Sequence, residues 1–192
     1  QEPPISISDL DLPILQGEVI VYYSEGYKER AANLQEIIEA ADCFLGRPEV
    51  LGIELNLGLA VLDAKDWSRW TRIPYGLAHI QLGDSPVAIM PATEDNILVN
   101  SVQENKHRVT DEIIVRFHNL GFSYESAAVI VFMDLLGIHE IGHIYSEAYE
   151  TWPKEKWLSE FIATYLAYAF LMESRPELAQ LWDTMMDSMI ET

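Results

Sequence analysis

The stretch His139-Glu140-Ile141-Gly142-His143 places two imidazoles and a carboxylate within five residues of a 192-residue chain. In an α-helix, His139 and His143 lie one turn apart and project from the same face, so both can bind one metal ion. Glu140 follows the first histidine and projects to the side, where its carboxylate can reach a metal-bound water. Two imidazoles and a second carboxylate, from elsewhere in the chain, would fill three tetrahedral positions of a metal ion. The fourth position is left for that water, which makes zinc the expected metal, one ion per chain.

A third protein ligand is required, because two histidines alone hold zinc poorly. The best candidate is Glu160, which follows His143 by 17 positions in the otherwise apolar segment Trp157-Leu-Ser-Glu-Phe-Ile-Ala163. Two antiparallel helices joined by a short loop would bring Glu160 opposite both histidines. Thr164, one turn beyond Glu160, is placed to hydrogen-bond a ligand from outside the coordination sphere.

The second half of the chain has the pattern of successive helices. Ser123 is a candidate N-cap for a long, mostly apolar helix that carries the motif and ends near Ala148. Pro153 fits the first turn of the next helix, expected over 153–173, and a last helix is expected to start at Ser174-Arg-Pro-Glu177. Residues 93–121 are polar, with one helix expected between Thr110 and His118.

The first half has the pattern of a mixed sheet with a helix. The expected strands are 18–23, one or two within 49–64 (most securely 59–62), 78–82 and 86–90, the last two joined by a hairpin at Gly83-Asp84-Ser85; the expected helix is 27–43. Residues 1–17, rich in proline and glycine, are interpreted as an extended arm. The sequence therefore predicts an α+β fold with one domain at 18–192, an α+β lobe (18–121) followed by a helical lobe (122–192).

These residues resemble the gluzincin branch of the zincin metallopeptidases, which have an HExxH helix, a glutamate ligand on a following helix and an N-terminal α+β lobe. The matching segments are HEIGH, flanked by uncharged residues, and the Trp-Leu-Ser-Glu-x-x-Ala segment that ends at Ala163. Metzincins fit worse, because Ser146 and Tyr149 stand where that branch needs glycine and histidine. An aspartate ligand fits worse too, since no aspartate occurs between Asp134 and Asp183.

The resemblance implies a zincin-like fold and a zinc-dependent peptidase acting on a peptide or protein substrate. His139, His143 and Glu160 would be the metal ligands, and Glu140 would take a proton from the attacking water and pass it to the leaving amine. A strand such as Pro86–Met90 could pair with an extended peptide, although an ordinary strand is the simpler interpretation. The tetrahedral oxyanion needs a second donor. The candidates are Tyr145, Tyr149, Tyr165, Tyr168, His79, His107 and His118.

Composition restricts the partners and the compartment. The formal charge of −19, from 31 acidic and 12 basic residues, argues against nucleic acid or an anionic membrane, because both would be repelled. A cationic substrate would be attracted, although the charge also serves solubility.

Cys43 is the only cysteine, so an intrachain disulfide and a cysteine-ligated zinc site are excluded. The apolar runs 127–138 and 161–172 are shorter than the roughly 18 residues of a membrane span, so none is expected. The start at Gln1 favours a secreted or periplasmic protein, with a cytoplasmic location left open.

Three alternatives stay open. The motif could lie on an inert helix with two hydrogen-bonded histidines, or in a zincin-like protein that binds metal without catalysis. Glu140-x-x-His143 together with Glu104-Asn-Lys-His107 could also form a di-iron carboxylate site. That third alternative leaves His139 without a role, and the bound metal distinguishes it from a zinc site.

Overall fold

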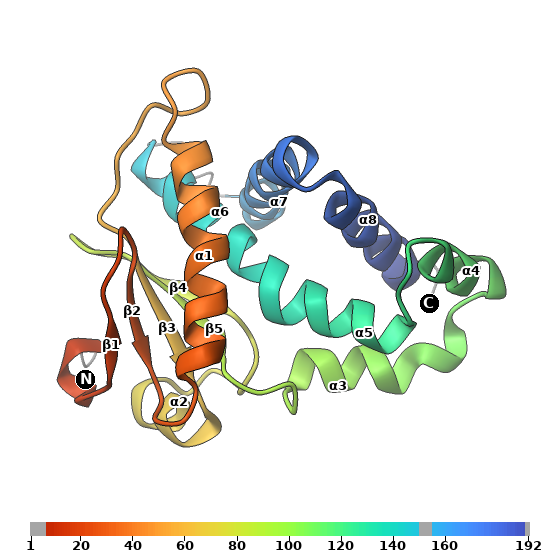
Figure 1. Ribbon diagram of the computed structural model, residues 1–192, viewed down its shortest axis with the longest axis horizontal. Helices are drawn as coiled ribbons and strands as arrows, with labels where there is room; N and C mark the ends of the chain where they lie inside the picture. Colours follow the sequence, from red (N-terminus) through yellow and green to blue (C-terminus); the bar gives the residue numbers. More distant parts are fainter. Residues whose placement is uncertain (1–6, 150–154, 191–192) are drawn as a thin grey trace.

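The computed structural model describes residues 7–149 and 155–190, which form an α+β fold around a mixed five-stranded sheet (Figure 1). The predicted α+β class is confirmed. The strands are β1 (Ile14–Leu15), β2 (Ile20–Tyr23), β3 (Gly58–Leu62), β4 (His79–Gln81) and β5 (Val87–Pro91). The helices are α1 (Lys28–Leu45), α2 (Ala64–Trp70), α3 (Ile97–Glu104), α4 (Asp111–Asn119), α5 (Tyr124–Val129), α6 (Leu136–Ala148), α7 (Lys156–Ser174) and α8 (Pro176–Ile190), with 3-10 turns η1 (Ile7–Leu10) and η2 (Asn105–Arg108) and a π-helical segment η3 (Ile130–Leu135).

The strand order in the sheet is β1-β2-β3-β5-β4, with β2, β3 and β5 parallel and the two outer strands antiparallel to their neighbours. Side chains of α1 and α6 pack on one face of the sheet, and side chains of η1 and α2 pack on the other. The central strands β3 and β5 are therefore buried on both faces. Burial on both faces explains why these strands appear in the sequence as continuous apolar runs.

The hairpin predicted at Gly83-Asp84-Ser85 is confirmed, because β4 and β5 are antiparallel neighbours. The suggestion that Pro86–Met90 could pair with an extended peptide is wrong, because β5 lies between β3 and β4 and both of its edges are occupied. The free edge on this side of the sheet belongs to β4, which packs beside α6.

The N-terminal segment packs against the sheet where it is described. Residues 1–6 of the expected arm lie outside the described residues. Ile7 and Leu10 of η1 are buried in a cluster with Trp67, and β1 pairs with β2. The short strand β1 was not predicted, because two residues are too few to give an alternating pattern.

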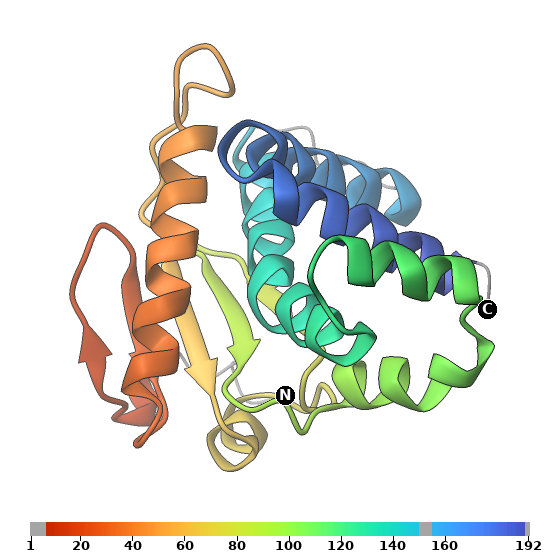
Figure 2. The ribbon, with the colours of Figure 1, turned by 45° about the vertical axis from the view of Figure 1, so that its right-hand side comes forward.

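The motif lies in a continuous helical path, Tyr124–Ala148, made of α5, η3 and α6. Its predicted start is confirmed, since Ser123 and Ser126 form a reciprocal capping box. This path is long and apolar enough to cross a membrane by length and composition, but 78% of its most apolar window is buried, as in the core helix of a globular protein. In Figure 2, α7 lies beside α6, and α8 lies beside α7. Pro153 lies outside the described residues.

Candidate metal centre

Two imidazoles meet on the face of α6 that turns toward α7. His139 and His143 are both buried, and their Nε2 atoms lie 3.1 Å apart. The two rings stand almost at right angles, with 89° between their planes. The one-turn spacing of the motif therefore brings the metal-binding nitrogens of both rings to one point.

Glu160 of α7 completes a triangle with the two imidazoles. Its Oε2 lies 3.2 Å from His139 Nε2 and 3.5 Å from His143 Nε2. For tetrahedral zinc with bonds of about 2.0–2.1 Å to nitrogen and oxygen, the ligand atoms lie roughly 3.4 Å apart. The three sides of the triangle agree with that separation, so the donors present fit a metal ion of this size. Within 7–149 and 155–190, no other cluster of three or more His, Cys, Asp and Glu side chains could hold a metal ion.

Gly142 explains how α7 comes close enough to α6 for Glu160 to reach the histidines. A Cβ at position 142 would lie 2.9 Å from the carbonyl oxygen and 3.0 Å from the Cα of Ala163. Real Cβ atoms do not approach backbone this closely, so any larger residue would push the two helices apart. The glycine inside the motif thus sets the distance between the helices that carry the three candidate ligands.

Two hydroxyl groups from α7 orient the imidazoles. Ser159 Oγ lies 3.2 Å from His143 Nδ1, and Thr164 Oγ1 lies 3.2 Å from His139 Nδ1. With Nδ1 protonated, each ring donates to its hydroxyl and turns the lone pair of Nε2 toward the centre. The contact of Thr164 was predicted. Sequence reasoning missed Ser159, although its position next to Glu160 places it on the same stretch of helix.

Burial keeps the imidazoles neutral. Desolvation, reinforced by the charge of His143, lowers the pKa of His139 to about 4, and the nearby carboxylate of Glu160 offsets only part of this effect. Desolvation also lowers the pKa of His143 against the opposing influence of Glu160. Because metal ions bind neutral imidazole, no proton has to be displaced from either Nε2 at neutral pH.

Glu140 lies beside the centre and is itself buried. Desolvation, followed by repulsion from Glu160, raises the pKa of its carboxyl group to about 8. A carboxyl group in such an environment is a much stronger base than one in water. A cation bound at the neighbouring triangle would favour its ionised form.

The segment η3 sets the direction in which the histidines point. A π-helical turn contains about one more residue than an α-helical turn, so it rotates the following helix by about 100° relative to an unbroken α-helix. Arg30 of α1 holds this turn through its guanidinium, which donates to the carboxylate of Asp134 and to the carbonyl oxygen of Met133. On another side, Asn96 Nδ2 contacts Met133 Sδ at 3.1 Å. Without the turn, both histidines would be rotated by about 100° from their present direction toward α7.

Most of the predicted oxyanion donors are engaged elsewhere. The Tyr145 hydroxyl donates to Asp42 Oδ1 at 2.7 Å, and burial raises its pKa. The Tyr168 hydroxyl donates to Asp183 Oδ2 at 2.8 Å. His79 stacks on Trp70, while His107 and His118 are exposed on η2 and α4. The two exposed candidates nearest to the centre in sequence are Tyr149, at the end of α6, and Tyr165 of α7.

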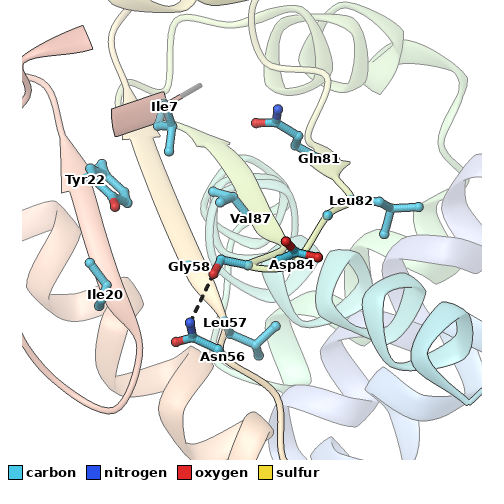
Figure 3. Close-up of a pocket in the computed structure, with 12 residues that line it drawn as sticks. Ile7, Ile20, Tyr22, Asn56, Leu57, Gly58, Gln81, Leu82, Asp84 and Val87 are labelled. Atoms are coloured by element: carbon cyan, nitrogen blue, oxygen red, sulfur yellow. Dashed lines mark hydrogen bonds between the residues drawn. The ribbon is translucent and has the colours of Figure 1, made fainter. Parts of the chain in front are cut away.

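A separate cavity of about 420 Å³ opens on the η1 side of the sheet and has a different character (Figure 3). Its floor is one row across four strands, in which Ile20 pairs with Gly58, Gly58 with Val87 and Val87 with Gln81. Among the described residues that line the cavity, Asp84 is the one with a charge, and they include no group of metal ligands.

The second Glu-x-x-His unit does not contribute to the centre. Glu104 ends α3, and His107 lies in η2 with its Nδ1 3.0 Å from the Glu104 carbonyl oxygen. Among the described residues, neither belongs to a group of possible metal ligands.

Comparisons with protein-family models, with curated proteins and with solved structures gave no match to this chain. The geometry of His139, His143 and Glu160 is therefore the main indication of function.

Proposed function

We propose that this protein is a zinc-dependent peptidase of gluzincin type in which His139, His143 and Glu160 hold the metal. The observation that carries the proposal is the triangle of their three donor atoms, with sides of 3.1, 3.2 and 3.5 Å. Two neutral imidazoles and one carboxylate are a donor set found in catalytic zinc sites that keep one position open. A bound zinc ion would lower the pKa of a water molecule and polarise a carbonyl group.

Glu140 supplies the proton transfer in this proposal. Its carboxylate accepts a proton as water adds to the carbonyl carbon of the peptide, and it then delivers that proton to the leaving nitrogen. Burial and the charge of Glu160 raise the pKa of this group, which makes its carboxylate a stronger base than one in water. Ser159 and Thr164 keep both rings in the orientation that presents Nε2.

The surrounding fold supports the same proposal. The resemblance implies a zincin-like arrangement in which an α+β lobe stands beside the motif helix, and here α6 packs against β4 and β5. The strand β4 lies at the edge of the described sheet, and the outer edge of such a strand can hydrogen-bond an extended peptide. We propose that β4, rather than β5, aligns the substrate.

The test combines elemental analysis with a peptide-cleavage screen on the full chain. We expect one zinc ion per chain and cleavage that stops when a chelator removes the metal and returns when zinc is restored. Cleavage that ignores the chelator would reject the proposal. A His118→Ala variant, which changes an exposed histidine on α4, should behave like the wild type, whereas His143→Ala should lose both zinc and cleavage.

A metal-binding protein without hydrolytic activity is the second candidate. The observation that favours it is the engagement of Tyr145 with Asp42 and of Tyr168 with Asp183, which removes two possible donors to an oxyanion. Stoichiometric zinc in a protein that cleaves no member of a broad peptide library would support this candidate.

A further inference from the structure

An exposed aromatic face runs along α7. Trp157, Phe161 and Tyr165 recur every four residues, and they are 69%, 61% and 62% exposed. Residues at this spacing lie on one face of a helix. The rings of Phe161 and Tyr165 stack, with centroids 6.4 Å apart and 21° between their planes. Three large aromatic side chains in one exposed row are unusual for a free surface and typical of a binding site.

This aromatic face is continuous with the candidate metal centre. Glu160 lies between Trp157 and Phe161 in the sequence, and its side chain is 48% exposed although its Oε2 reaches both imidazoles. Thr164, which contacts His139, precedes Tyr165. The opposite side of α7 packs on α6 through Ala163 and Ser159. A molecule bound at the centre therefore has the aromatic face next to it.

Acidic side chains outnumber basic ones among the described residues beside this face. The exposed Glu155 and the half-exposed Glu160 lie next to its aromatic residues in the sequence, whereas the one basic residue of α7 is Lys156, at its first position. The exposed Asp183 of α8 accepts a hydrogen bond from the hydroxyl of Tyr168, which lies on α7. With a formal charge of −19, the whole protein attracts cations. Aromatic rings also attract cations through their faces.

We propose that the aromatic face of α7, defined by Trp157, Phe161 and Tyr165, binds a cationic amphipathic segment of the peptide or protein substrate. Apolar side chains of that segment pack on the three rings, and its lysine or arginine residues lie over the rings and near Glu155 and Asp183. The inference rests on the proposed peptidase function and adds the substrate class to it.

The direct test measures binding without turnover. A zinc-loaded Glu140→Gln protein is titrated into a labelled helical peptide of leucine and lysine and into the same peptide with glutamate in place of lysine. We expect the lysine peptide to bind at least tenfold more tightly, with an affinity that falls as salt increases.

Two variants in the same background locate the binding surface. Phe161→Lys places a positive charge in the middle of the face and should weaken binding of the lysine peptide at least tenfold; Trp157→Ser tests the end nearest Glu155 by removing a ring without adding charge. The matched control is Val115→Ser, which changes an exposed apolar residue on α4 and should leave binding unchanged. Circular dichroism checks that every variant is folded.

Each other outcome overturns the inference. Equal binding of both peptides would refute the charge preference. A loss with Val115→Ser as large as that with Phe161→Lys would show that the aromatic face is not the binding surface. A dimer in light scattering that Phe161→Lys dissociates would assign the face to a second copy of the chain, and binding to anionic lipid vesicles with no peptide preference would assign it to a membrane. Zinc-dependent cleavage without preference for cationic peptides would refute this inference alone, whereas tight binding in a protein that never hydrolyses peptides would refute the proposed function and with it the role of the face in substrate binding.

Discussion

Two polar clusters lie inside this protein, and they differ in how their hydrogen-bonding groups are matched. In the first, at the ends of β2 and β3, Ser24 Oγ donates to Asp66 Oδ2 at 2.8 Å and Arg69 Nη1 donates to Asp66 Oδ1 at 2.8 Å. Each carboxylate oxygen has a donor. In the second cluster, His139 Nε2, His143 Nε2 and Glu160 Oε2 converge within 3.5 Å of one another. With both Nδ1 atoms protonated, no hydrogen lies between these three atoms.

The directions of the pKa shifts show the same difference. Burial disfavours ionisation of Asp66, but the hydroxyl of Ser24 and the charge of Arg69 outweigh it and hold the pKa of this carboxyl group below its usual value. At the candidate metal centre, burial dominates, and the pKa of Glu140 is raised while those of both histidines are lowered. The first cluster is complete as a structural element, whereas the second brings together three side chains that could hold a metal ion.

The proposed peptidase function predicts its largest effect for a substitution of Glu140. Glu140→Gln keeps the size of the side chain and removes the proposed base, so we expect the rate of hydrolysis to fall by about 10²–10⁴. The zinc content should stay at one ion per chain, because Glu140 is not one of the three ligands. Steady-state kinetics and elemental analysis on the same preparation measure both quantities. Full activity in this variant would refute the assigned role.

The next effect concerns the distance between α6 and α7. Gly142→Ala places a methyl group against the backbone of Ala163 at about 3 Å, so the helices must separate and the triangle must widen. We expect zinc affinity to fall by about 10–100-fold and stability to fall by about 1–3 kcal/mol.

The matched control is Gly137→Ala, also in α6. Its methyl group would meet the tip of the Ile38 side chain at 3.1 Å, and that side chain can move. Competition titration with a zinc indicator should find nearly normal affinity in Gly137→Ala. Equal losses in the two variants would mean that the close approach at Gly142 does not control the centre.

A smaller effect is expected from the two hydroxyls that orient the imidazoles. Thr164→Val and Ser159→Ala each leave a ring Nδ1 without its partner from α7, so we expect a loss of about tenfold in zinc affinity for each. Thr164→Ser restores the hydroxyl and should recover most of the affinity. Isothermal titration of the zinc-free protein measures these changes. A Thr164→Ser variant as weak as Thr164→Val would assign the effect to packing.

Local signals predicted the motif helix, the start at Ser123 and the glutamate on the next helix, because capping and apolar periodicity depend on neighbouring residues. Three features depend on distant contacts instead. The π-helical turn is held by Arg30, about 100 positions upstream of Asp134; the sequence from Ala127 to Ile138 looks like ordinary apolar helix. The reason for a glycine at position 142 is the backbone of Ala163 on α7. The position of β5, rather than β4, beside β3 follows from a crossover between β3 and the β4–β5 hairpin. Helix α3 was missed because Asn96, its N-cap, stands in a polar stretch without a clear apolar stripe.

The smallest effect on the metal centre should come from the matched cluster. Asp66→Asn places an amide NH₂ where one oxygen accepts a hydrogen bond from Ser24 or Arg69, so the free energy of unfolding should fall by about 1–3 kcal/mol at neutral pH. Zinc affinity should not change. Because the pKa of Asp66 is lowered in the folded state, its contribution is complete above the ordinary carboxyl pKa and is lost as the pH falls through the folded-state value. Urea unfolding at a series of pH values should therefore show the gap between wild type and Asp66→Asn closing below roughly pH 4. A gap that stays constant down to the acid transition would mean that the charge of Asp66 does not stabilise the fold. The electrostatic difference between the Asp66 cluster and the candidate metal centre would then be refuted.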